Sequence, residues 1–322
     1  MTMANELSPT AANLFREIHG CPNLEAIVRA VLAVWPEHEG YCLARFADNA
    51  GDFKARANTL AGTVLAIVGD ELPLYATDYR WMCEEFINEE LHFRRNGAYR
   101  LSTFAEANAE VYSNGKYMER YVRGILISQI IWKPHAQAFD FFQTHFLPSL
   151  PQASSYLEVG PGHGMFLYMA ATAERIAKVE AWDVSESSIL ETKSTLRRMG
   201  LKRDVNIVLQ DVLKAPTRTG EFDGAIISEV LEHLERPDLA LASLRAALKP
   251  GGRIFINAPV NSPAPDHIYL WRSTDEFRQF VIDQGLEIEQ FEEFPVTGAT
   301  LDKAKRHKLS ISCVVIARKP GV

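Results

Sequence analysis

Short apolar runs alternate with amphipathic segments throughout the second half of the chain, and this alternation constrains the fold more than any other feature. We expect strands at 155–159, 178–183, 206–210, 222–228, 252–258, 286–294 and 309–318. Helical spacing is present among them at 165–173, 185–199, 229–248 and 273–284. Such alternation predicts right-handed crossovers and a parallel sheet with helices on both faces. The last two strands have no helix between them, so the predicted α/β fold is a doubly wound, seven-stranded, mostly parallel sheet with an antiparallel pair at one edge.

The first half of the chain has helical spacing almost without interruption, up to a boundary near 146–155. Expected helices cover 24–34, 55–68, 80–93 and 112–147. Pro134 should divide the last of these, because proline removes a hydrogen bond and clashes with the preceding turn. We therefore divide the chain into a helical domain, 1–150, and an α/β domain, 151–322. The helical domain is expected to select the substrate, to cover the site as a lid, or to form a homodimer interface.

Charge and composition limit the partners of this protein. The 322 residues carry a net charge of −7, which argues against broad binding to nucleic acid, since that contact needs a basic face. The four cysteines have no CxxC spacing and are expected to be reduced core residues. The first residues lack leader features, and no apolar run approaches the length of a membrane span. We expect a cytoplasmic protein with no membrane partner.

A glycine-rich turn connects the first expected strand to the helix that follows it. Residues 157–164 read LEVGPGHG, and glycines there permit a sharp turn and a close approach of a ligand to the main chain. The spacing is G-x-G-x-G, which differs from the G-x-G-x-x-G of dinucleotide-binding folds. Glu158 leads into the turn, where its charge would repel a pyrophosphate and suit a cationic ligand.

Two further acids stand at the ends of expected strands. Asp183 ends the second strand, where a carboxylate can accept hydrogen bonds from ribose hydroxyls, and Asp211 ends the third strand. Each acid alone is more typical of a helix N-cap or a solvated side chain than of a ligand contact. Acids at the carboxyl ends of three successive strands, however, lie at the edge where open α/β sheets bind ligands.

These features together resemble the class I methyltransferases that use S-adenosylmethionine (SAM). The resemblance covers about 155–319 and includes LEVGPGHG, Asp183, LQDV at 209–212, FDGAIISEVLEHL at 222–234 and LKPGGRIFI at 248–256. It implies a Rossmann-like sheet, with Asp183 at the ribose, Val184 against adenine and Asp211 at the adenine amino group. The SAM-binding residues that the resemblance implies are Glu158, Gly160, Pro161, Gly162, Gly164, Asp183, Val184, Gln210, Asp211, Val212 and Ser228.

A second group of polar residues follows the fourth expected strand. Glu229, Glu232 and His233 are spaced i, i+3 and i+4, so they would share one face of the helix expected there. His267 lies in the loop after the fifth strand, at the same edge of the sheet. Carboxylates and imidazoles at this edge form a candidate site for a divalent metal.

The pattern E-x-x-E-H with a downstream histidine resembles two groups of metal-dependent methyltransferases. One group comprises the O-methyltransferases of ubiquinone biosynthesis, and the other methylates the 2′-hydroxyl at the 3′ end of small RNAs. The resemblance implies Glu229, Glu232, His233 and His267 as ligands of Mg, Mn, Fe or Zn, which would lower the pKa of a bound hydroxyl. Two alternatives stay open: His233 as a catalytic general base without metal, and a structural role.

SAM-dependent O-methylation of a small-molecule acceptor is the function that we expect from these residues. Metal-dependent C-methylation of an α-keto acid and 2′-O-methylation of RNA are alternatives. A basic run at 303–308, expected as a hairpin loop, weakly favours RNA. A catalytically silent SAM-binding protein and an NAD-dependent oxidoreductase are disfavoured by the intact glycine turn and its spacing. Four aromatic residues, Tyr112, Tyr117, Tyr121 and Trp132, lie on the helices that lead into the α/β domain; most are expected in the core, and one or two are candidates to roof the SAM pocket.

Overall fold

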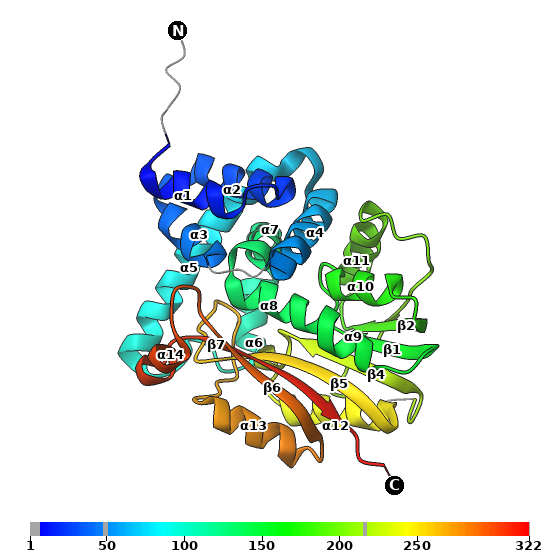
Figure 1. Ribbon diagram of the computed structural model, residues 1–322. Coiled ribbons are helices and arrows are strands. Elements are labelled where there is room, and N and C mark those ends of the chain that lie inside the picture. The colour runs from blue at the N-terminus through cyan, green and yellow to red at the C-terminus, as the bar shows by residue number, and fades with distance from the viewer. Residues whose placement is uncertain (1–6, 48–50, 215–217, 322) are drawn as a thin grey trace.

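The N-terminal part of the computed structural model, which describes residues 7–47, 51–214 and 218–321, is helical (Figure 1). Its elements are α1 (Pro9–Glu17), α2 (Pro22–Val34), η1 (Pro36–His38), α3 (Glu39–Phe46), α4 (Gly51–Val68), η2 (Gly69–Glu71), α5 (Leu72–Asn96), α6 (Phe104–Ala107), η3 (Asn108–Tyr112), α7 (Gly115–Ile131), α8 (Lys133–Phe141), η4 (Phe142–Phe146) and α9 (Leu147–Ser149). The predicted division at Pro134 is confirmed, because α7 ends at Ile131 and α8 has this proline in its first turn.

A seven-stranded sheet forms the C-terminal part, in the order β3-β2-β1-β4-β5-β7-β6. The strands are β1 (Ser154–Val159), β2 (Ile176–Asp183), β3 (Asn206–Leu209), β4 (Phe222–Ser228), β5 (Leu248–Val260), β6 (Glu287–Pro295) and β7 (Ile311–Arg318). β7 is antiparallel to both β5 and β6, and the other neighbours are parallel. The predicted α/β fold is confirmed. The strand order reverses between β1 and β4, so a ligand crevice is expected at their carboxyl ends.

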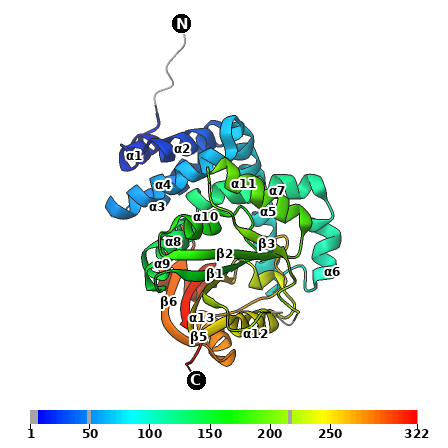
Figure 2. The same cartoon turned by 90° about the vertical axis from the view of Figure 1, so that its right-hand side faces the viewer.

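Helices cover both faces of this sheet, as Figures 1 and 2 show. α10 (Met165–Thr172) and α11 (Glu186–Arg198) lie on the same face as the helical part, and α12 (Pro237–Ala247) and α13 (Thr274–Asp283) lie on the opposite face. Each face has its own apolar core, with Phe255 of β5 in the first and Ile254 in the second. Alternate residues of one strand therefore serve two cores.

The helical part and the sheet share the first of these cores. Phe142 of η4 lies edge-on to Phe255 of β5, with ring centroids 5.4 Å apart, and Phe139 of α8 stacks on Phe166 of α10 at 3.9 Å. Buried aromatic pairs of this kind contribute about 0.5–1.5 kcal/mol each beyond the area that they bury. The two parts are thus held by packing as well as by the chain that joins them. Within the described residues, no helix has the length and apolarity needed to cross a membrane.

The basic run at 303–308 does not form the predicted hairpin loop. Most of it belongs to α14 (Leu301–His307), a short helix between β6 and β7. Thr300 caps the helix by accepting a hydrogen bond from the Lys303 main-chain N–H, and Lys308 ends it with a φ of 50°. Lys305 pairs with Glu293 of β6 at 2.7 Å. The sequence-based expectation missed the helix because the cap and this pair carry it, rather than an apolar stripe.

Candidate active site

The glycine turn after β1 leaves the main chain accessible at the edge where the strand order reverses. Gly160, Gly162 and Gly164 have φ values of 65°, 51° and 72°, in the left-handed region that favours glycine. A Cβ on Gly160 would lie 2.7 Å from Val230 Cγ2, whereas a Cβ on Gly162 would have nothing within 4 Å. Open space at Gly162 leaves room for a ligand against its main chain.

Two threonine side chains of α11 and a main-chain carbonyl of α7 hold this turn in place. Thr192 Oγ1 in α11 donates to the Gly162 carbonyl oxygen at 2.8 Å, and Thr195 Oγ1 donates to that of His163 at 2.9 Å. His163 Nε2 lies 3.0 Å from the Val122 carbonyl oxygen of α7, which can only accept a hydrogen bond. Sequence reasoning missed these contacts, because nothing in the local pattern shows which hydroxyl reaches the turn.

Two of the predicted acids have pKa values raised by burial. Glu158 is 3% exposed and accepts a hydrogen bond from the Tyr156 hydroxyl at 3.0 Å. Burial raises the pKa of Glu158 to about 8, although the Tyr156 hydrogen bond acts in the opposite direction. Burial also raises the pKa of Asp183, whose Oδ1 accepts from the Ser185 main-chain N–H at 2.9 Å. A cationic ligand nearby would favour the ionised form of either acid.

The predicted SAM residues fall into two sets in the structure. Those that line one cavity are Glu158, Gly160, Pro161, Gly162, Asp183 and Ser228. Those outside its lining are Gly164, Val184, Gln210, Asp211 and Val212. Val184 is 64% exposed, and Asp211 Oδ1 accepts from the Leu213 main-chain N–H at 2.9 Å. The second set therefore lies beside the crevice, and its contact with a ligand stays a prediction.

Glu229, Glu232 and His233 do not lie on one α-helix, so the prediction of a shared helical face was wrong. Glu229 has a φ of 52°, and the only helical turn here is η5, a 3-10 turn of Leu231–His233. The Glu229 main-chain N–H donates to the Asn257 carbonyl oxygen of β5 at 2.9 Å, which continues the sheet contact beyond β4. A left-handed glutamate is strained, and strain of this kind concentrates at functional sites.

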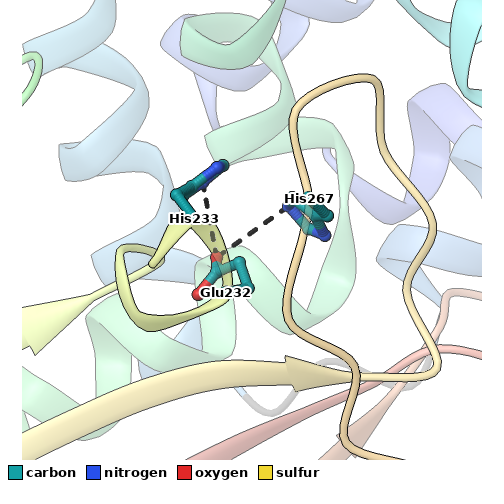
Figure 3. Close-up of side chains that lie close together, drawn as sticks. All are labelled: Glu232, His233 and His267. Carbon is teal, nitrogen blue, oxygen red and sulfur yellow. Dashed lines mark ion pairs between the residues drawn. The ribbon is translucent and has the colours of Figure 1, made fainter. Parts of the chain in front are cut away.

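Glu232, His233 and His267 nevertheless converge, each offering a ligand atom within 4.8 Å of the others (Figure 3). Glu232 Oε1 is 3.7 Å from His233 Nε2 and 3.9 Å from His267 Nε2. The loop after β5 brings His267 to η5, and the Ile268 and Tyr269 main-chain N–H groups fix the approach by donating to the Glu232 carbonyl oxygen at 2.9 Å. Glu229 is outside this three-atom group.

Main-chain carbonyls determine which nitrogen of each imidazole carries the proton. His233 Nδ1 lies 3.1 Å from the Asp266 carbonyl oxygen, and His267 Nδ1 lies 2.7 Å from the Ser262 carbonyl oxygen. Because a carbonyl oxygen only accepts, both Nδ1 atoms must be the donors. With the proton on Nδ1, the Nε2 atom of each ring is the one that faces Glu232. Burial lowers the pKa of His267 to about 4, which keeps its ring neutral.

The carboxyl group of Glu232 has no hydrogen-bond partner among the described residues. Its side chain is fully buried, and both oxygens are unpaired, as is Oε1 of Glu229. Burial raises the pKa of Glu232 well above its usual range, and the neighbouring charge of Glu229 adds to the effect. Glu232 Oε1, His233 Nε2 and His267 Nε2, three potential acceptors, therefore converge with no donor between them. Such an arrangement needs either a proton or a cation to be stable.

Sequence reasoning missed Asp266. Its carboxylate lies on the Nδ1 side of His233 and is held there by two tyrosines. Asp266 is 4% exposed and accepts hydrogen bonds from the Tyr121 hydroxyl at 2.8 Å and the Tyr112 hydroxyl at 3.3 Å. Its Oδ2 lies 3.5 Å from His233 Nδ1. Of the four aromatic residues considered as a roof, Tyr112, Tyr121 and Trp132 line the cavity, and the two tyrosines also hold an acid beside His233. Its position directly before His267 was the available signal for Asp266.

One cavity of about 870 Å³ connects the glycine turn, the Glu232 group and the helical part. The volume is within the range of sites for small molecules. Its helical wall is largely aromatic and includes Trp35, Tyr41, Phe86, Trp132 and Phe139. The acids in the lining are Glu90, Glu158, Asp183, Glu191, Glu229, Glu232 and Asp266, and the described lining contains no lysine or arginine. The cavity is therefore acidic at its sheet end and apolar in the helical part.

Residues 157–256 match the family model described as a methyltransferase domain, and the sheet order and the G-x-G-x-G turn agree with a class I SAM-dependent methyltransferase. The chain is similar to the ubiquinone biosynthesis O-methyltransferase of Idiomarina loihiensis, with 27% identity over 183 residues, 51% of this chain and 74% of that protein. The enzyme of that name from Dechloromonas aromatica is 33% identical over 107 residues, 33% of this chain and 45% of its own length. A SAM-dependent methyltransferase of Aquifex aeolicus has a TM-score of 0.43 and 20% identity, covering 59% of this chain and 92% of that chain.

Proposed function

We propose that this methyltransferase transfers the methyl group of SAM to a hydroxyl of an uncharged small molecule, at a divalent metal held by Glu232, His233 and His267. The observation that carries the proposal is the convergence of two imidazole Nε2 atoms on a buried carboxyl whose two oxygens have no hydrogen-bond partner. A metal-free general base needs one imidazole and no such carboxyl. The O-methyltransferase relatives support the same chemistry.

The donor set fits a divalent transition metal. Two imidazoles with one carboxylate suit Zn²⁺, Fe²⁺ or Mn²⁺ better than Mg²⁺, which prefers oxygen ligands throughout. Glu229, whose Oε1 is also buried and has no hydrogen-bond partner among the described residues, is a candidate for a further ligand. A divalent metal in such a site lowers the pKa of a coordinated hydroxyl, which makes the oxygen a better nucleophile.

The remaining residues are expected to orient SAM and to exclude water. Glu158 would pair with the ammonium group of SAM, and Asp183 would accept hydrogen bonds from the ribose. The open main chain at Gly162 would lie under the amino-acid part of the cofactor. With SAM in this position, the aromatic wall of the helical part would enclose the acceptor, so that the methyl group and the hydroxyl are held in line.

The charge of the cavity supports an uncharged acceptor over the two alternatives. A ribose at the end of an RNA brings phosphates, and an α-keto acid brings a carboxylate. The described cavity lining holds carboxylates and no lysine or arginine, so either acceptor would place like charges together. The basic run at 303–308 weakly favoured RNA, but Lys305 within it is paired with Glu293.

Metal content and methyl transfer test this proposal together. We expect purified protein to contain a divalent transition metal by elemental analysis. Protein treated with excess EDTA should lose transfer of labelled methyl from SAM to neutral phenols and alcohols, and Zn²⁺ or Mn²⁺ should restore it. Full activity in metal-depleted protein would contradict the metal, and transfer to RNA or a keto acid alone would contradict the acceptor class.

Alanine at Gly162 should block the cofactor without unfolding the protein. Its Cβ has open space in the structure but would occupy the position expected for SAM, and the left-handed φ of 51° adds about 1–2 kcal/mol of strain. We expect the affinity for S-adenosylhomocysteine, measured by calorimetry, to fall at least about 10-fold, a free-energy loss of roughly 1.4 kcal/mol. Gly164→Ala is the comparison, because its Cβ would lie 3.2 Å from Thr192 Cγ2 and should lower stability instead. Unchanged affinity in Gly162→Ala would place SAM elsewhere.

A further inference from the structure

Two side chains of the helical part, Tyr112 and Tyr121, reach the proposed metal site through Asp266, which lies beside His233. Tyr112 ends η3 and Tyr121 belongs to α7, whereas Asp266 belongs to the loop after β5. The two hydrogen bonds to Asp266 span 154 residues of sequence from Tyr112 and 145 from Tyr121. Packing of the helical part on the sheet is what brings them together.

The hydrogen bonds of this group run in one direction only. The Tyr121 hydroxyl donates to Asp266 Oδ1 at 2.8 Å, and the Tyr112 hydroxyl donates to Asp266 Oδ2 at 3.3 Å. His233 Nδ1 lies 3.2 Å from the Tyr112 oxygen and 3.1 Å from the Asp266 carbonyl oxygen. Since Tyr112 uses its proton on Asp266, its oxygen can accept from His233 Nδ1. The contact with the Asp266 carbonyl oxygen therefore requires the proton on Nδ1, and the contact with Tyr112 is compatible with it.

Asp266 depends on the two tyrosines because it has no cationic partner other than His233. Its side chain is buried, and no lysine or arginine pairs with it among the described residues. A buried carboxylate needs donors on its oxygens, and here the donors are two phenols from the helical part. Tyr121 is itself fixed, since its ring stacks against Phe86 of α5 at 6.2 Å and against Tyr117 at 6.1 Å.

We infer that Tyr112, Tyr121 and Asp266 are positioning residues that set the orientation and tautomer of His233, so that the helical part completes the site formed by Glu232, His233 and His267. The inference rests on the proposed function, in which His233 Nε2 binds the metal. Outer partners of this kind fix the ring orientation of metal-binding histidines, and their loss typically weakens metal affinity about 10–100-fold. The arrangement also gives the helical part a role in the chemistry beyond enclosing the acceptor.

The experiment compares Tyr121→Phe, Tyr112→Phe and the double variant with Tyr117→Phe as the matched control. Tyr117 lies one turn before Tyr121 on α7, and its hydroxyl donates to Glu85 at 3.2 Å instead of to Asp266. Each variant loses one hydroxyl and keeps its ring. Binding of S-adenosylhomocysteine by calorimetry reports whether the cofactor end of the site is intact, and Tyr112→Phe keeps the test available should Tyr121→Phe fail to fold.

Two measurements that need no acceptor follow His233 directly. Co²⁺ titration of metal-depleted protein reports affinity from visible absorption, and ¹⁵N spectra of histidine-labelled protein report the tautomer of His233, assigned with His233→Gln. We expect Tyr121→Phe to weaken Co²⁺ binding about 10–100-fold, and the double variant to lose the fixed Nδ1–H signal as well. Tyr117→Phe should match the parent protein within two-fold.

The outcomes separate this inference from the proposed function. Should the double variant bind Co²⁺ like the parent and keep the Nδ1–H signal, the positioning role is overturned. Equal loss in Tyr117→Phe would also overturn it, because the effect would then come from packing. Should the parent protein bind no Co²⁺ at all, the metal part of the proposed function fails, and the tautomer of His233 in the variants still decides the inference.

Discussion

Glu232→Gln is expected to weaken metal binding more than about 100-fold, because it replaces the carboxylate that both imidazoles face. Loss of a residue that only hydrogen-bonds to a metal ligand typically costs less, about 10–100-fold. Glu232 Oε1 lies within 3.9 Å of His233 Nε2 and His267 Nε2. An amide at this position keeps the shape of the side chain but removes its negative charge. Two neutral imidazoles alone would bind a divalent ion weakly, so proposed methyl transfer should fall with metal occupancy.

The same substitution should stabilise the metal-free protein at neutral pH. Burial and the charge of Glu229 raise the pKa of Glu232 well above that of an unfolded chain, so the unfolded state releases this proton at a lower pH than the folded state does. A raised acid pKa in the folded state lowers stability as pH rises above the unfolded value near 4.3. Glutamine removes that penalty. We expect the melting temperature without metal to increase by a few degrees, although the new amide also lacks partners.

Calorimetry with Zn²⁺ and thermal unfolding of EDTA-treated protein check both expectations. Glu229→Gln is the matched comparison, because it is the same change three residues earlier, on a side chain outside the three-atom group. Its loss of metal affinity should be smaller than that of Glu232→Gln. Parent-like Zn²⁺ affinity in Glu232→Gln would contradict the assignment, and a larger loss in Glu229→Gln would move the site toward that residue.

Most of the fold was predicted from the pattern of apolar runs and from the glycine turn. Buried parallel strands are short apolar runs, and a left-handed turn before a helix requires glycine, so both leave a local signal. The structure confirms strands within a few residues of the expected ranges, with β4 at Phe222–Ser228 as predicted. α14 was missed because Thr300 and the Lys305–Glu293 pair stabilise it, and neither gives a periodic pattern.

The candidate site was accessible from sequence only in part, because its residues come together by topology. Because the carboxyl ends of parallel strands meet at one edge of the sheet, the sequence correctly predicted that His267 lies near Glu232 and His233. The helical spacing of Glu229 was misleading, since its backbone is left-handed. The contact of Tyr121 with Asp266 depends on how the helical part packs on the sheet. Nothing local in either segment encodes that contact.

Glu158→Gln is expected to weaken SAM binding at least about 10-fold and to remove the proton release that accompanies it. Hydrogen bonds to charged groups contribute about 1.5–3 kcal/mol, so loss of the charge on Glu158 opposite the SAM ammonium group should cost 10-fold or more in affinity. The pKa of Glu158 is about 8 without ligand, so the carboxyl is mostly protonated at pH 7. Pairing with the ammonium group would favour its ionised form, and the protein should then release up to one proton on binding.

In the absence of SAM, Glu158 should lower the stability of the folded protein as pH rises from 4.5 to about 8. Below pH 4.5 both folded and unfolded chains hold the proton, so Glu158→Gln and the parent should differ little through ionisation. Between pH 4.5 and about 8 the unfolded chain releases the proton and the folded chain retains it, so the parent loses stability as pH rises. Above pH 8 the penalty is constant. The variant lacks this loss and should melt at a higher temperature than the parent at pH 8.5.

Calorimetry in buffers of different ionisation enthalpy at pH 7 measures the released proton, and thermal unfolding at pH 4.5 and 8.5 measures the stability change. Glu191→Gln is a suitable control, because Glu191 of α11 also lines the cavity, whereas its carboxyl group makes no hydrogen bond or ion pair with the glycine turn among the described residues. Its affinity and proton release should match the parent.

Glu158→Gln could instead bind SAM with parent-like affinity and release the same number of protons. In that case the ammonium group of SAM pairs with another carboxylate, and Glu158 is buried for stability of the turn alone. That outcome is disfavoured, because a buried carboxyl with a pKa of about 8 lowers the stability of the folded state above pH 4.5, and only a cationic ligand offsets this cost.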